Sequence, residues 1–188
     1  MFKRLLFGLM YLTMTLVFTS CLSDDDGWRN NQVIDYSQNR GEVTYDGLSY
    51  PIKFMNIRPS GEVLTDGSRV YQIDLSTNYL NSNNNTIQTD ALFQADIIVP
   101  RNASITGNYD MLDLNGRTFN FAWYYEGVKI SGNQIVEYDF EIRNQDFVSG
   151  TLSLKYYNDG YAEVQINAID GYEGRNRPLN LWFAGYTN

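Results

Sequence analysis

Residues 151–169 read TLSLKYYNDGYAEVQINAI, with apolar and polar side chains alternating along both halves of the stretch. Alternation with a period of two predicts two strands that each bury one face. A three-residue loop that ends at a left-handed Gly160 pairs Leu154 with Val164. A two-residue loop would set apolar side chains opposite polar ones, because a slip of one residue turns a strand inside out. We therefore expect an antiparallel hairpin with a three-residue loop.

A second hairpin is predicted around the dipeptide Asp46-Gly47. This dipeptide is typical of a two-residue type I′ turn, which would pair Tyr45 with Leu48. Pro51 has no backbone N–H to donate to a neighbouring strand. The second strand of this hairpin is therefore expected at the edge of a sheet.

The same alternation recurs between turn signals in the rest of the chain, and no helix is predicted after residue 20. The further predicted strands are 69–76, 91–99, 117–125, 135–142 and 179–186, with turns at Asp66-Gly67, Glu126-Gly127 and Asp170-Gly171. About eight to ten short strands at this spacing favour an all-β fold. We predict an antiparallel β-sandwich of immunoglobulin-like or jelly-roll-like type, with a closed β-barrel as the second choice.

Composition excludes several classes of function. The 188 residues contain 14 basic and 22 acidic side chains, no histidine and one cysteine. Without histidine, Ser-His-Asp and Cys-His catalysis and most transition-metal sites are excluded. The basic residues are scattered singly, which argues against nucleic-acid binding. We expect no cofactor and no metal, since the stretch from Asp113 to Gly116 has only part of a calcium-loop pattern.

The first 21 residues have the three parts of a secretory signal. Lys3 and Arg4 precede an apolar run at 5–18, and small polar residues lead to Cys21. The run is shorter than the stretch of about 20 apolar residues that a membrane-spanning helix needs. We therefore predict a signal peptide at 1–20 that is removed. Lipidation of Cys21 would then attach the chain to a membrane.

The stretch from Val17 to Cys21 resembles the lipobox of bacterial lipoproteins, with Phe18 in place of the usual leucine. The residues after it resemble the export signal of surface lipoproteins of Bacteroidota; they are Ser23, Asp24, Asp25 and Asp26. The resemblance implies an outer-membrane protein, lipid-anchored and facing the cell exterior. The alternative is that the acidic run is only a solvated spacer. We expect a flexible tether at 21–32 and one domain at 33–188, generally similar to small β-rich lipoproteins of unassigned function.

One five-residue stretch could carry catalysis. Residues 137–141 read EYDFE and resemble the Glu-x-Asp-x-Glu strand of retaining glycosidases with a jelly-roll fold. The resemblance implies that Glu137 is the nucleophile and Glu141 the acid/base, with Asp139 between them. The favoured alternative is a solvated strand face opposite a buried one, which would contain Val136, Tyr138, Phe140 and Ile142. We therefore expect a protein that is not an enzyme.

Aromatic residues supply the other candidate site. Phe119, Phe121, Trp123 and Tyr125 share a parity and are expected to pack between the sheets. In the last strand Leu179, Leu181 and Phe183 take one face, which places Trp182 on the other. Tyr157 and Tyr161 are likewise predicted to point outward from their hairpin. Such side chains could stack on a sugar or anchor a protein, or could be covered by another layer.

These observations favour a non-catalytic surface lipoprotein that binds a glycan or a protein through Trp182, Tyr157 and Tyr161. It could assist an outer-membrane uptake or adhesion system. The alternatives are a structural or fimbrial subunit that exchanges a terminal strand with a neighbour, and, less favoured, the glycosidase using Glu137 and Glu141.

Overall fold

The computed structural model describes residues 35–80, 86–113, 118–132 and 134–188. The chain divides into two units, 1–34 and 35–188, and the description concerns the second unit. The predicted lipidation site Cys21 and export signal, Ser23 with Asp24, Asp25 and Asp26, lie outside the described residues. Among the residues described, no helix has the length and apolar character needed to cross a membrane.

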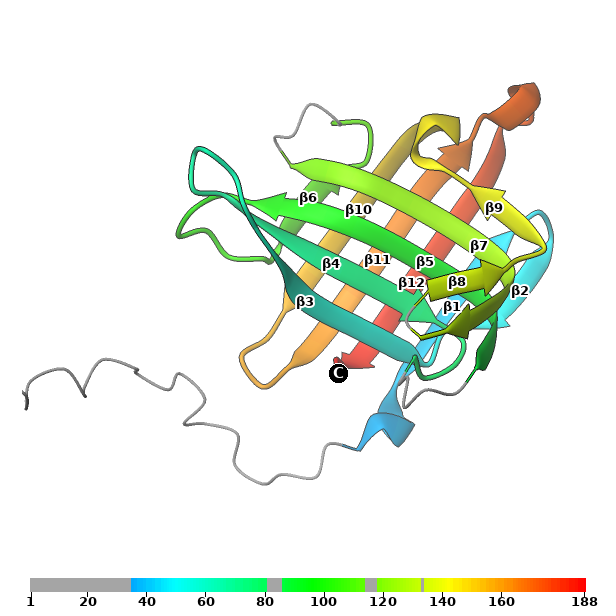
Figure 1. Cartoon of the computed structure of the whole chain (residues 1–188), viewed down its shortest axis with the longest axis horizontal. Coiled ribbons are helices and arrows are strands. Elements are labelled where there is room, and N and C mark those ends of the chain that lie inside the picture. Colours follow the sequence, from blue (N-terminus) through cyan, green and yellow to red (C-terminus); the bar gives the residue numbers. More distant parts are fainter. Residues whose placement is uncertain (1–34, 81–85, 114–117, 133) are drawn as a thin grey trace, which may run out of the picture. The chain divides into compact units, whose positions relative to one another are not determined.

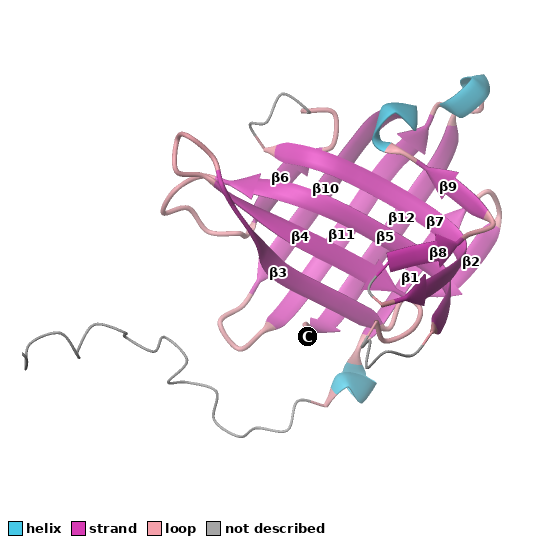
Figure 2. Ribbon diagram, viewed as in Figure 1, coloured by secondary structure: helices cyan, strands magenta, loops and turns pink. Residues whose placement is uncertain are grey.

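The second unit consists of two antiparallel sheets, which confirms the predicted all-β sandwich (Figures 1 and 2). The first sheet has the order β2 (Leu48–Pro51), β1 (Arg40–Tyr45), β12 (Arg177–Tyr186), β11 (Tyr161–Asp170), β10 (Phe147–Tyr156) and β6 (Gly107–Asp110). The second has the order β3 (Phe54–Val63), β4 (Arg69–Ser76), β5 (Ile87–Val99), β7 (Phe119–Ser131) and β8 (Gln134–Glu137), and β9 (Phe140–Ile142) also pairs with β7. Short 3₁₀ turns, Tyr36–Gln38, Asn144–Asp146 and Tyr172–Gly174, are the only helical elements in the described part.

Both predicted hairpins are confirmed in register. Leu154 pairs with Val164 across β10 and β11, and Gly160 has a φ of 85°. Tyr45 pairs with Leu48 across β1 and β2, and both residues of the turn between them have positive φ. The strand that contains Pro51, β2, lies at the edge of the first sheet as predicted.

The hydrophobic core lies between the two sheets, where alternate side chains of both sheets meet. Its largest fully buried members include Tyr124, Phe93, Phe119, Phe183, Met55, Ile73 and Ile97. Burying apolar area of this kind supplies most of the favourable free energy of folding. The other face of each sheet points away from this core and is available for function.

The prediction for the aromatic face of β7 is wrong for three of its four residues. Ala122 and Tyr124 pack in the core, so Phe121, Trp123 and Tyr125 point to the outer face of the second sheet. Phe119 does face the core, because the pairing of β5 with β7 shifts by one residue next to it. A bulge of this kind moves a side chain to the opposite face.

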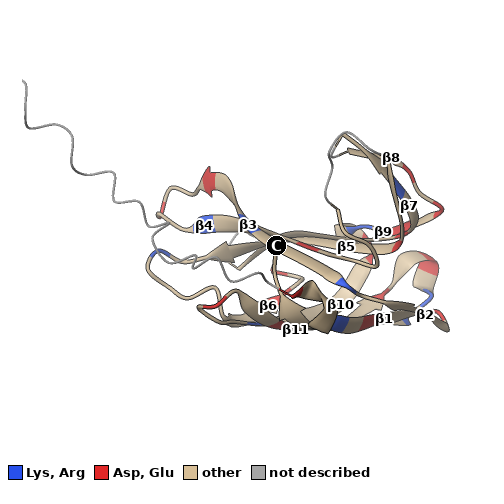
Figure 3. Ribbon diagram, turned by 90° about the horizontal axis from the view of Figure 1, so that it is seen from below, with Lys and Arg blue, Asp and Glu red and all other residues tan. Residues whose placement is uncertain are grey.

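The predicted turn at Glu126-Gly127 is also wrong, because both residues lie inside β7. Gly127 has a φ of 61°, and a Cβ there would clash with a carboxylate oxygen of Asp139. The strand bends at this glycine and continues to pair with β8. In Figure 3 the far end of β7 and β8 curls away from the layer of β1 and β11. The curl encloses a small second cluster of Leu92, Tyr125, Val128 and Ile130.

Candidate functional site

The three aromatic residues predicted to point outward lie on the outer face of the first sheet. Trp182 is 43% exposed and Tyr157 is 44% exposed, while Tyr161 is partly buried. The alternative that another layer of the same chain covers Trp182 is therefore wrong for the described residues. The parity argument for β12 is confirmed, since Phe183 is fully buried.

These three residues do not form one site. Tyr161 lies between Tyr157 and Tyr186, with ring centroids 5.8 and 5.4 Å away. Trp182 precedes Tyr186 by four residues on the same strand, a separation of about 13 Å at about 3.3 Å per residue. Its cross-strand neighbours are instead Glu42 and Gln165. Trp182 therefore stands in a polar surround apart from the tyrosines.

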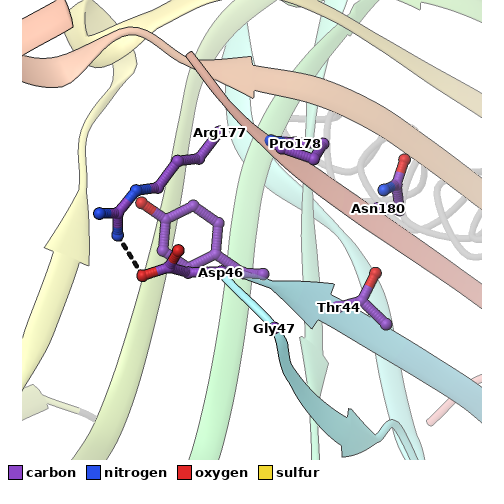
Figure 4. Close-up of a pocket in the computed structure, with 7 residues that line it drawn as sticks. Thr44, Asp46, Gly47, Arg177, Pro178 and Asn180 are labelled. Carbon is purple, nitrogen blue, oxygen red and sulfur yellow. Dashed lines mark hydrogen bonds and ion pairs between the residues drawn. The ribbon is translucent and has the colours of Figure 1, made fainter. Parts of the chain in front are cut away.

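A hollow of about 280 Å³ is lined by Thr44 and Asn180, the outward pair that follows the pair of Glu42 and Trp182 along β1 and β12 (Figure 4). Arg177 forms an ion pair with Asp46 at its rim. At its base the hydroxyl of Tyr45 donates a 2.5 Å hydrogen bond to Asp170, and both residues are buried.

These interactions hold the β1–β2 hairpin against the end of β11. Burial, followed by the hydrogen bond to Asp170, raises the pKa of Tyr45 far above its ordinary value, so the phenol stays protonated. The charges of Arg177 and Asp46 neutralise each other. The hollow thus has a structural role, and its polar rim extends the surface around Trp182.

The predicted glycosidase strand is not one strand. β8 ends at Glu137 and β9 begins at Phe140, so the expectation that Glu137, Asp139 and Glu141 share one strand face is wrong. Glu137 pairs with Lys129 and Glu141 with Arg143.

The apolar side predicted opposite these carboxylates is only partly correct. Val136 and Tyr138 are exposed, whereas Phe140 is partly buried and Ile142 is buried. The break occurs because Asp139 packs against Gly127 and donates its N–H to the carbonyl of Glu126.

A more organised polar surface lies on the outer face of the second sheet. Gln72 is directly opposite Asp96, and Asp74 is directly opposite Gln94. Two carboxylates and two amides thus alternate in a square, which we call the carboxylate–amide face. The residues between them, such as Ile73, belong to the core, which places the square on the side away from it.

Hydrogen bonds and one ion pair connect most of this face. Gln94 Nε2 donates to Asp74 Oδ1 at 2.9 Å, and Arg58 Nε donates to Gln72 Oε1 at 3.1 Å. Arg58 also approaches the second oxygen of Asp74 at 3.5 Å. Directed partners of this kind fix the orientation of each polar group and make the surface more rigid.

Asp96 is the exception within this network. Asp96 is only 6% exposed, and its Oδ1 has no hydrogen-bond partner among the described residues. Burial is the largest cause that raises the pKa of Asp96 to about 6; the side chains of Asn120 and Gln72 oppose the rise, and the nearby charges of Asp74 and Glu62 add to it. An orphan buried acceptor of this kind needs an explanation beyond packing.

Aromatic rings border the carboxylate–amide face on the side of β7. Phe121 is opposite Asp96 and Trp123 is opposite Gln94. The ring centroids of Phe121 and Trp123 are 5.2 Å apart, those of Trp123 and Tyr125 are 6.0 Å apart, and those of Tyr125 and Tyr138 are 5.5 Å apart. Trp123 remains 37% exposed within this row. The surface therefore combines apolar ring faces with fixed acceptors and donors.

The sequence does contain a signal for this site. The predicted strand 91–99 places Gln94 and Asp96 on its outer parity, and Asp74 follows from the strand 69–76. The alternation does not predict how these two strands pair, and only the correct register brings the four polar residues of the carboxylate–amide face together. The incorrect prediction that Trp123 packs in the core also hides the aromatic border of this face.

No group of three or more possible metal ligands occurs among residues 35–80, 86–113, 118–132 and 134–188. Comparison with protein-family models, curated proteins and solved structures finds no match for this chain.

Proposed function

We propose that the protein is a non-catalytic, lipid-anchored surface protein that binds a glycan on the carboxylate–amide face. The observation that carries the proposal is the square of Gln72, Asp74, Gln94 and Asp96 beside the exposed ring of Trp123. The predicted lipid anchor at Cys21 and acidic export signal support a place on the cell exterior, where glycans are the common polar ligands.

The chemistry of the face matches that of a sugar. Sugar hydroxyls can donate to the carboxylates of Asp74 and Asp96 and accept from the amides of Gln72 and Gln94. The apolar C–H face of a sugar ring can lie on Trp123, whose ring offers a large surface with little conformational freedom to lose.

The two exposed tryptophans permit a matched test. The chain without its first 21 residues would be incubated with a glycan array and with cell-envelope extracts, beside the variants Trp123→Ala and Trp182→Ala. The two positions are similarly exposed on opposite sheets. We expect Trp123→Ala to abolish glycan binding and Trp182→Ala to retain it, with the folded state of both checked by circular dichroism.

Other outcomes separate the remaining candidates. Loss of glycan binding in Trp182→Ala alone would move the site to the polar surround of Glu42 and Gln165, as the sequence first suggested. Capture of an envelope protein through Trp182, without any glycan, would favour the protein-binding alternative. Silence of the unmodified protein in both screens would contradict the proposal.

A further inference from the structure

We propose a second binding site, for an organic anion with an apolar body, in a hollow at the ends of β4 and β5. The hollow has a volume of about 490 Å³ and is lined by Val63, Arg69, Tyr71, Val99, Arg101 and Asn102, among others. This volume falls within the range of about 300–1,000 Å³ that is usual for small-molecule sites. It does not overlap the carboxylate–amide face, and the inference does not depend on the proposed glycan binding.

The first observation concerns charge. Six basic side chains of the described part form ion pairs with Asp or Glu: Arg58, Lys129, Arg143, Lys155, Arg175 and Arg177. Arg69 and Arg101 form none of these pairs, and they line the same hollow. The whole chain has a net charge of −8, so most of its surface repels anions. Arg40 and Lys53 form no such pair either, but Arg69 and Arg101 lie together, so the hollow carries two arginines that have no Asp or Glu ion-pair partner in the described part.

Two turns position the arginine at the outer side of the hollow. Gly67 N–H donates to the carbonyl of Leu64 at 2.9 Å, and Ala103 N–H donates to that of Pro100 at 3.0 Å. The aliphatic part of Arg101 lies across Gly67, where an added Cβ would be 3.1 Å from Cδ of the arginine. The absence of a side chain at Gly67 lets the stem of Arg101 pack there, and the packing restricts where its guanidinium can point.

The inner wall of the hollow is apolar. Tyr71 is partly buried and packs against the core, and Val99 is a core residue directly opposite Arg69 across the sheet. The lining of the hollow therefore combines apolar side chains with two arginines. An inorganic anion would leave the apolar part of the lining in water. A neutral apolar molecule would leave both arginines unpaired. An anion attached to an apolar body satisfies both parts.

Isothermal titration calorimetry can test this site with octanoate, octyl sulfate and octyl phosphate. Octyltrimethylammonium is the probe of opposite charge, and inorganic sulfate is the anion without an apolar body. The double variant Arg69→Gln/Arg101→Gln removes both cations. The control Arg40→Gln/Lys53→Gln removes the same charge at exposed positions that do not line the hollow. Loss of charge-assisted hydrogen bonds should weaken binding of the octyl anions at least about tenfold in the first variant.

We expect the control to bind the octyl anions as the unmodified protein does, and the preferred head group to identify the anion as carboxylate, sulfate or phosphate. Equal weakening in both double variants would mean attraction by net charge alone and would overturn the proposal. So would equal binding of octyltrimethylammonium, equal binding of inorganic sulfate, or no binding of any octyl anion. If the double variant does not fold, the single variant Arg101→Gln, at an exposed position, gives the same comparison.

Discussion

Replacing Asp96 with Asn is expected to stabilise the protein at neutral pH while weakening its ligand binding. Burial raises the pKa of Asp96 from its ordinary value of 3.8 to about 6. The folded state therefore prefers the protonated carboxyl, and ionisation favours the unfolded state. The stability that the neutral form contributes is fully present below about pH 4 and is lost as the pH rises through about 6.

The magnitude follows from the difference between the two pKa values. A difference of about two units corresponds to about 3 kcal/mol of unfolding free energy at a pH above both values. Asn has nearly the same shape and never ionises, so the variant does not lose this stability. The gain of Asp96→Asn over the unmodified protein should be about 1 kcal/mol at pH 4.5 and should approach about 3 kcal/mol at pH 8.

Urea denaturation at a series of pH values between 4 and 8 measures this difference directly. Asp90→Asn is the matched control, because it removes the same charge from an exposed position on the same strand. A gain in Asp96→Asn that does not change with pH would refute the reasoning from the raised pKa. If that variant also bound the glycan as tightly as the unmodified protein, Asp96 would have no part in the site.

Four further substitutions test the fold. Phe183→Ala should destabilise the protein by about 3–5 kcal/mol in thermal melts as a large-to-small core change, whereas Trp182→Ala should have little effect; equal losses would mean that Trp182 is covered. Tyr45→Phe removes the buried hydrogen bond to Asp170 and should lower the unfolding free energy by about 1.5–3 kcal/mol in urea; an unchanged midpoint would argue against that bond. Gly127→Ala adds a Cβ at positive φ against a neighbouring side chain and should cost about 2 kcal/mol or more; proteolysis should then reveal loosened β8 and β9, and wild-type resistance would contradict the bend.

The outer face of the first sheet could be predicted because tight turns set its register. The Asp46-Gly47 turn and the loop ending at Gly160 each permit one pairing that keeps apolar residues together. The alternation of side chains along β12 then places Trp182 on the outer face of the first sheet. The pairing of β11 with β12 is not needed for this prediction, since the alternation within β12 alone assigns Phe183 to the core.

The second sheet could not be predicted in the same way because its strands contain irregularities within their length. The pairing of β5 with β7 shifts between Asp96 and Ile97, and β7 bends at Gly127. Nothing in the local alternation marks a bulge, and the dipeptide Glu126-Gly127 has the same signature in sequence as a turn. The large apolar rings of Phe121 and Trp123 then appeared to belong to the core, although Ala122 and Tyr124 are the residues that fill it.

The error in β7 has a physical basis that bears on function. A sheet whose outer face is only solvated does not need large rings there, and it does not need a buried carboxylate with an unpartnered oxygen. The second sheet has both, in Trp123 and Asp96. For stability of the fold alone, a polar side chain would be more favourable at position 123 and an amide at position 96. Two adjacent departures from what folding favours are the pattern expected where a surface is built for a ligand. The prediction for Asp96→Asn tests this directly, because one substitution should improve stability and impair binding at the same time.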